Sequence, residues 1–252
     1  MDLVSQFKNT LLSQACKAGN NHMERLEKYC EMAKAFAVVQ GGVAVISDLL
    51  YDKSHIFSGA FGKALGLDDE TECETAFEDM IFSVVDHQDL LDRHILELRY
   101  IELIKSLLAD ERGDYMQSSV IDIRLGDRVV PVIHQTRYLE ITDDGSVNIG
   151  LCTYLPVGLS FPDKVAGRIF NIKTGMPLSS ERLQLVDDNI LTRREREVLS
   201  LLSKGMASKQ IASALNVSLN TVYRHRQNIL RHLNVANTAE AVRIGVKMKL
   251  VI

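Results

Sequence analysis

The stretch from Ser218 to Leu233 combines basic and amide side chains at helical spacing and contains no carboxylate. Asn220, Arg224, Gln227 and Arg231 are separated by four, three and four residues, so on an α-helix they lie on one stripe. Guanidinium groups pair with guanine edges and phosphates, and amides pair with adenine edges. We interpret this stripe as a surface for double-stranded DNA, because a solvated surface helix would usually include Asp or Glu.

The opposite stripe of this helix is apolar. Val222, Ile229 and Leu233 are spaced by seven and four residues, which predicts that they face a core. Ser218 is expected to cap the helix at its start. A preceding helix, capped by Ser208, would be joined to it through Asn216, a residue type that tolerates the left-handed conformation of a tight turn. The pattern is therefore that of a helix-turn-helix motif.

A further helix is expected upstream of this pair. Thr192 and Glu195 have the spacing of a capping box, in which each side chain accepts a hydrogen bond from the other residue's backbone N–H. Gly205 is expected to end that helix.

Charge is distributed unevenly along the chain. The segment 191–252 holds 11 Lys and Arg against 3 Asp and Glu, whereas residues 1–190 hold 18 against 30. A compact basic segment after an acidic body indicates two domains, of which only the second suits a polyanion. Charge alone would equally fit a solvated basic face.

The C-terminal segment resembles the DNA-binding domain of LuxR-type bacterial transcription regulators. The resemblance covers about 60 residues and lies in the segments Leu191–Leu199, Lys209–Ala212 and Ser218–Val222, with Gly205, His225, Leu233, Val235, Glu240 and Ala241. Two positions depart from the commonest pattern: Tyr223 stands where Lys is frequent, and Thr238 where Arg is frequent. The first departure bears on base preference, and neither affects the expected fold.

The resemblance implies a role for each polar residue of this region. Tyr223, Arg224 and Gln227 would contact base edges in the major groove. The last helix, from Thr238 to about Lys249, would support the helix that carries these residues, and in this family it often joins two subunits. The expected DNA-binding residues are Lys209, Ser218, Asn220, Thr221, Tyr223, Arg224, Gln227 and Arg231, of which Lys209, Asn220, Thr221 and Arg231 would contact phosphates.

The first part of the chain is expected to be an α+β domain. Helical spacing of apolar residues predicts helices over 2–15 and 22–37, a small helix over 59–67, and a helical stretch with breaks over 74–108. Alternating patterns predict strands over 118–127, 129–141 and 146–157, and apolar runs add strands over 43–48 and 54–58. Asp144-Gly145 is a hairpin signal. We predict an antiparallel sheet of about five strands with helices on one side.

The segments 43–67 and 84–94 resemble a PAS domain. His87–Leu90 falls where that family often carries an H-P-x-D-like turn, although Gln88 replaces Pro. The resemblance spans about 120 residues and is looser than the C-terminal one. It implies a sensing or dimerising module, with any ligand held between sheet and helices.

Several other site classes are disfavoured. The order of elements does not fit a phosphorylated receiver domain, and the absence of Trp disfavours the acyl-homoserine lactone receptors of the LuxR type. No flavin-adduct cysteine motif is visible, and no haem-ligating histidine can be singled out. His87 and His94 lie among carboxylates, but a capped polar helix start explains them more simply than a metal. For His134, Cys152 and Tyr154 we expect core packing. No catalytic constellation, metal site or cofactor is assigned, and the protein is interpreted as not an enzyme.

Composition indicates a globular cytosolic protein. The chain has 252 residues, 46% hydrophobic and 25% charged, with no membrane-spanning stretch and no N-terminal targeting signal in the sequence. The four cysteines are scattered, which favours reduced thiols. Localisation is therefore expected to be cytoplasmic.

We accordingly expect N-terminal helices over 1–37, a PAS-like sensor or dimerisation domain over 38–160, a linker over 161–188, and a four-helix LuxR-type helix-turn-helix domain over 189–252. The expected function is sequence-specific DNA-binding transcription regulation by a homodimer. RNA polymerase and a small molecule in the PAS-like domain remain open as partners. Two alternatives stay open: a sigma-factor-like accessory protein of RNA polymerase, and a signalling scaffold whose basic domain binds protein.

Overall fold

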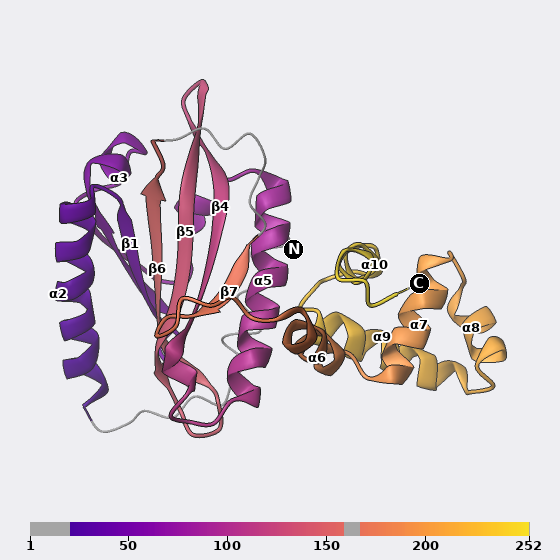
Figure 1. The fold of residues 1–252 in the computed structure, drawn as a ribbon. Coiled ribbons are helices and arrows are strands. Elements are labelled where there is room, and N and C mark those ends of the chain that lie inside the picture. The colour runs from indigo at the N-terminus through magenta and orange to yellow at the C-terminus, as the bar shows by residue number, and fades with distance from the viewer. Residues whose placement is uncertain (1–20, 159–166, 252) are drawn as a thin grey trace.

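The computed structural model describes residues 21–158 and 167–251. The helix expected over 2–15 lies outside these residues. The described chain forms an α+β domain followed by a domain of helices, joined side by side (Figure 1).

The N-terminal domain is built on one antiparallel sheet of seven strands in the order β3-β2-β1-β6-β5-β4-β7. The strands are β1 (Val43–Asp48), β2 (Lys53–Ser58), β3 (Glu70–Cys73), β4 (Tyr115–Leu125), β5 (Arg128–Ile141), β6 (Val147–Pro156) and β7 (Arg168–Asn171).

The prediction of about five strands was wrong, because it missed the two edge strands β3 and β7. Both β3 and β7 are four residues long, too short to show a clear alternating pattern. They form because each finds an unpaired edge, β3 on β2 and β7 on β4. The strand β7 and the helix α6 (Ser180–Ile190) both lie in the segment that we expected to be a linker.

Helices cover both faces of the sheet, so the expected one-sided arrangement was also wrong (Figure 1). On one face α2 (His22–Gln40) packs Leu26, Ala33 and Ala37 against Ala44 and Ile46 of β1. The other face is covered by α3 (Ala60–Ala64), α4 (Asp79–Phe82) and α5 (His87–Ser106). Every residue of β1 is buried, which explains why its first four residues, Val43–Ile46, form an apolar run rather than an alternation.

The helix α5 contributes side chains to two cores. Asp86 caps its start by accepting a hydrogen bond from the Gln88 backbone N–H at 2.8 Å, so the capped polar start expected here is present. Leu96 and Tyr100 pack towards the sheet, whereas Leu91 and Ile95 belong to the core of the C-terminal domain. A 3₁₀ turn, Arg112–Asp114, follows it.

The C-terminal domain consists of α7 (Arg193–Ser203), α8 (Ser208–Ala214), α9 (Leu219–His232) and α10 (Thr238–Lys247). The predicted capping box of Thr192 and Glu195 is present. Burial would raise the pKa of the Glu195 carboxyl, but hydrogen bonds from Thr192 hold that pKa below its usual range. Gly205 and Asn216 adopt positive φ angles of 79° and 51° at the ends of α7 and α8, as expected.

One cap differs from expectation. Ala207, not Ser208, is the N-cap of α8, and the Gln210 side chain accepts a hydrogen bond from its backbone N–H at 2.8 Å. Ser208 lies inside the helix, and its hydroxyl instead accepts a hydrogen bond from Arg226. The Ser208 hydroxyl therefore binds a side chain of α9 instead of capping its own helix.

No helix among residues 21–158 and 167–251 combines the length and the apolar character needed to cross a bilayer.

Candidate nucleic-acid interface

The polar stripe of α9 faces outward. Val222, Ile229 and Leu233 are buried, as predicted, and this orients the opposite side of the helix towards solvent. Of the eight residues expected at DNA, seven are exposed and Thr221 is half-buried; the exposed ones are Lys209, Ser218, Asn220, Tyr223, Arg224, Gln227 and Arg231. The helix thus offers a continuous basic and amide surface.

Two neighbouring arginines of α9 have different surroundings. Arg226 donates hydrogen bonds to Ser208 at 2.7 Å and to Thr238 at 2.8 Å, so it ties α9 to α8 and to α10. Arg224 is exposed, and within the described parts of the chain neither it nor Gln227 hydrogen-bonds another side chain. Only Arg224 is therefore available to a ligand without breaking contacts inside the domain.

The start of α9 is fixed by its cap. The Ser218 hydroxyl accepts a hydrogen bond from the Thr221 backbone N–H at 3.1 Å, and the two hydroxyl groups lie 2.8 Å apart. The first turn holds no acidic residue. The positive end of the helix dipole therefore adds to the basic side chains and suits an anion such as phosphate.

Two arginines of α7 are neutralised by carboxylates. Arg194 pairs with Glu197 at 2.6 Å, and Arg196 pairs with Asp188 at 2.6 Å. In contrast, Lys209, Arg224 and Arg231 form no ion pair with any residue that the structure describes. Lys209 and Arg231, where phosphate contacts are predicted, and Arg224, where a base contact is predicted, are therefore available to a polyanion.

The N-terminal domain contacts the helical domain on a different side. The His94 imidazole of α5 hydrogen-bonds the Leu233 carbonyl at the end of α9, with an Nε2 to O distance of 3.0 Å. Lys247 of α10 forms an ion pair with Asp92 of α5. Arg99 of α5 donates two hydrogen bonds of 2.7 Å to Asp187 of α6. These contacts leave the outward stripe of α9 uncovered.

Acidification is expected to destabilise this contact through His94. Burial holds the pKa of His94 below its usual value, so the unfolded chain binds a proton at a higher pH than the folded chain. The contribution of the neutral imidazole to the free energy of unfolding is fully present above the ordinary histidine pKa of about 6.5. As the pH falls below about 6.5, this contribution decreases by up to about 1.4 kcal/mol per pH unit.

We expect His94→Gln, which retains an N–H donor but does not titrate, to lose less stability than the wild-type chain between about pH 7 and pH 5. Denaturant unfolding of both full-length proteins across this range measures the difference. Other buried histidines act equally in both proteins and cancel. Equal losses would contradict the assignment of this effect to His94.

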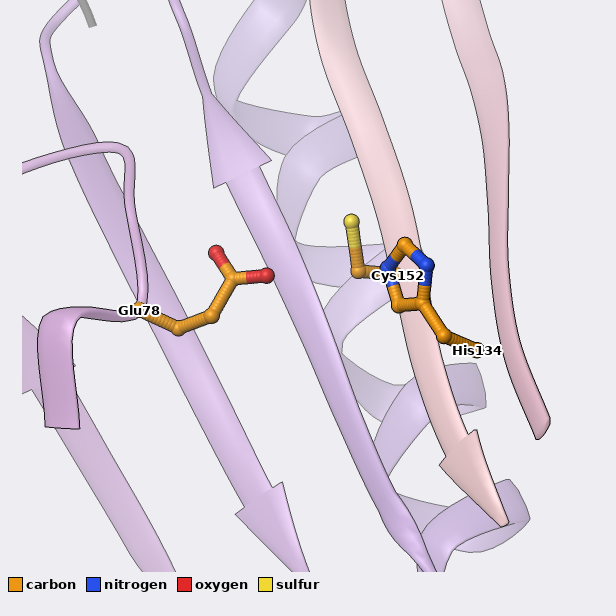
Figure 2. A group of neighbouring side chains, drawn as sticks. All are labelled: Glu78, His134 and Cys152. Atoms are coloured by element: carbon orange, nitrogen blue, oxygen red, sulfur yellow. The ribbon is translucent and has the colours of Figure 1, made fainter. Parts of the chain in front are cut away.

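A second cluster of polar side chains lies inside the N-terminal domain, and sequence reasoning missed it. Glu78, His134 and Cys152 are buried, and their carboxylate, imidazole and thiol atoms all lie within 4.8 Å of one another (Figure 2). His134 and Cys152 had been assigned to core packing, and Glu78 had not been singled out. The Asp144-Gly145 turn predicts that the strands carrying His134 and Cys152 pair, but the β5–β6 ladder has register irregularities between Tyr138 and Ile141, so the turn alone does not predict that these two residues become neighbours.

The comparison with known families addresses the C-terminal domain. Residues 189–244 match the family model described as bacterial regulatory proteins, luxR family. These residues form a LuxR-family helix-turn-helix domain. The match covers α7, α8 and α9 and most of α10, so the LuxR-family domain contains both the outward stripe of α9 and Lys209.

Curated relatives are similar over short segments. The chain is 37% identical over 83 residues to the transcriptional regulatory protein UhpA of Salmonella typhimurium, covering 31% of this chain and 42% of that protein. It is 49% identical over 53 residues to the nitrate/nitrite response regulator protein NarP of Escherichia coli, covering 21% and 25%. The chain thus spans less than half the length of these two relatives.

Solved structures align over most of the chain but superpose poorly. A phage VqmA–DPO complex has 16% identity and a TM-score of 0.29, covering 90% of this chain and 91% of that chain. Escherichia coli SdiA has 17% identity and a TM-score of 0.25, covering 100% of both chains. Scores this low support no conclusion about fold or function.

Proposed function

We propose that the protein is a sequence-specific DNA-binding transcription regulator that inserts α9 into the major groove. The LuxR-family domain supports this proposal, and one observation indicates which residues contact DNA. Arg224 and Gln227 project from an exposed, carboxylate-free stripe and are not engaged by the described protein. Arg224, Gln227 and Tyr223 would read base edges, while Lys209, Asn220, Thr221 and Arg231, with the cap at Ser218, would contact phosphates.

Selection of duplexes from a random DNA pool by the full-length protein tests this function. Enrichment of one sequence motif, with affinity that decreases as salt increases, is the expected result. Val222→Asp, which places a charge in the domain core, is the negative control. Retention of no duplex above that control would refute the proposal, as would retention without any enriched motif.

The two alternative functions give other results in the same assay. A sigma-factor-like protein would select a motif only when core RNA polymerase is present. A signalling scaffold would select no DNA under either condition. A motif enriched by the protein alone favours the proposed regulator over both.

The N-terminal domain is proposed to be a PAS-like regulatory module. Its antiparallel sheet and α5 support this role, because α5 contributes side chains both to the interior of this domain and to the core of the DNA-binding domain. A ligand or partner that shifts α5 would therefore change the contacts of His94 and Asp92 with the LuxR-family domain.

We further propose that the protein acts as a homodimer. The exposed residues Met32, Phe36 and Val39 are spaced by four and three positions on α2 and form an apolar stripe. Exposed apolar patches of this kind are typical of interaction surfaces. A solution mass of two chains at micromolar concentration is expected, and a strict monomer with and without DNA would contradict the dimer.

A further inference from the structure

The cluster inside the N-terminal domain is built by three separate elements. Glu78 directly precedes α4, His134 lies on β5 and Cys152 lies on β6. In the β5–β6 ladder His134 is opposite Tyr154 and Thr136 is opposite Cys152. His134 and Cys152 are therefore diagonal neighbours on the same face of the sheet, and the Glu78 carboxylate points towards them (Figure 2).

The donor set of this cluster is a familiar one for metals. Carboxylate, imidazole and thiolate are the three ligand types that bind zinc, and three protein ligands are the number that leaves one coordination position open. A mixed set with a thiolate favours ions of the zinc class over Mg²⁺ or Ca²⁺, which prefer oxygen ligands alone. From these residues we propose that Glu78, His134 and Cys152 form a binding site for a divalent transition metal of the zinc class.

The surrounding side chains are consistent with such an ion. Thr136 lies between the imidazole and the thiol, with its Oγ1 3.5 Å from His134 Nε2 and 3.6 Å from Cys152 Sγ. The Tyr154 hydroxyl donates a hydrogen bond of 2.5 Å to Glu78. Such outer contacts orient metal ligands and tune their affinity.

The Arg93 guanidinium is the main competitor for the site. It lies 3.1 Å from a Glu78 oxygen and 3.9 Å from Cys152 Sγ, and it neutralises the carboxylate when no ion is bound. The negative charges of Glu78 and of the Cys152 thiolate would balance those of a divalent ion.

Binding requires one proton to leave. A cysteine binds a metal ion as the thiolate, so the ion replaces the proton of the Cys152 thiol. That proton passes to solvent, and affinity is accordingly expected to increase with pH.

Cobalt(II) and zinc(II) titrations of the chelator-treated full-length protein test the proposal. We expect one ion per chain, an absorption band from thiolate to cobalt in the near ultraviolet, and a Tm that increases with zinc. Cys152→Ser should lose the band and the zinc-dependent increase in Tm. Glu78→Gln and His134→Asn should weaken binding by about 10-fold or more, the loss that even outer-shell changes can cause.

The matched control is Cys73→Ser, because Cys73 is a half-buried cysteine of the same sheet that lies on the edge strand β3. It should behave like the wild-type protein in both titrations. Far-ultraviolet circular dichroism of each metal-free variant distinguishes loss of the site from loss of the fold. A cobalt band that persists in Cys152→Ser, or a folded wild-type protein that takes up no ion, would overturn the proposal.

Discussion

Replacing Arg224 with alanine is expected to reduce the preference of the protein for its cognate sequence over a mismatched one by about 1–3 kcal/mol. A loss of 1.4 kcal/mol corresponds to about 10-fold in the ratio of the two affinities. The reason is that Arg224 is exposed and unengaged, so its guanidinium fork is free to pair with a base edge. Gln227→Ala is expected to relax preference at another position of the site by a similar amount.

Competition binding with the selected motif and its single-base variants measures this loss. Lys209→Ala is the first control: it should weaken binding to all duplexes alike and reduce the salt slope by about 1. Arg226→Ala is the second, since Arg226 bonds Ser208 and Thr238 within the domain. It should reduce the Tm of the domain and leave the affinity ratio unchanged. If Arg224→Ala retains full preference while Arg226→Ala loses it, the two faces of α9 are wrongly assigned.

Replacing Arg93 with methionine is expected to destabilise the folded protein by about 3–5 kcal/mol. Arg93 and Glu78 are both buried and lie 3.1 Å apart. Removing the guanidinium leaves the Glu78 carboxylate without the charge that compensates for its desolvation, and this is costlier than losing the attraction alone.

The free energy of unfolding in denaturant measures this effect, and two further variants isolate its cause. Glu78→Gln combined with Arg93→Met should recover most of the lost stability, because no uncompensated charge is then buried. Arg25→Met removes the more exposed partner of Glu140 and should cost only about 0–1 kcal/mol. Equal losses in the single and double variants would show that Arg93 acts by packing and not by charge.

The Arg93→Met variant also connects the stability of the protein with the proposed metal site. A zinc ion would supply the positive charge that Arg93→Met removes, so zinc should raise the Tm of this variant by more than that of the wild-type protein.

The helical domain could be predicted from the sequence almost completely, because its determinants are local. The capping box at Thr192, the left-handed turn at Asn216 and the cap at Ser218 each depend on residues within four positions of one another. Apolar spacing along one helix also fixes which side of α9 faces outward. The exception was Ser208, whose hydroxyl is used by Arg226 from another helix instead of capping its own.

The sheet domain could be predicted in every strand except its two shortest: β1 and β2 follow from apolar runs, and β4, β5 and β6 from alternation. Strands of ten residues or more show an alternating pattern, but the edge strands β3 and β7 have four residues each and exist through pairing with their neighbours. The placement of α2 on the face opposite α5 could not be predicted from the sequence either, because a buried strand such as Val43–Asp48 does not indicate which helix covers each of its faces.

The sequence by itself thus determined the LuxR-type helices and the residues of their outward stripe, because helical geometry relates positions three and four apart. Only the tertiary structure brought Glu78, His134 and Cys152 together, since these residues lie 56 and 18 positions apart and meet through strand register and the packing of α4. Tertiary packing likewise decided that α5 is shared by the cores of both domains, because that contact joins residues separated by more than a hundred positions.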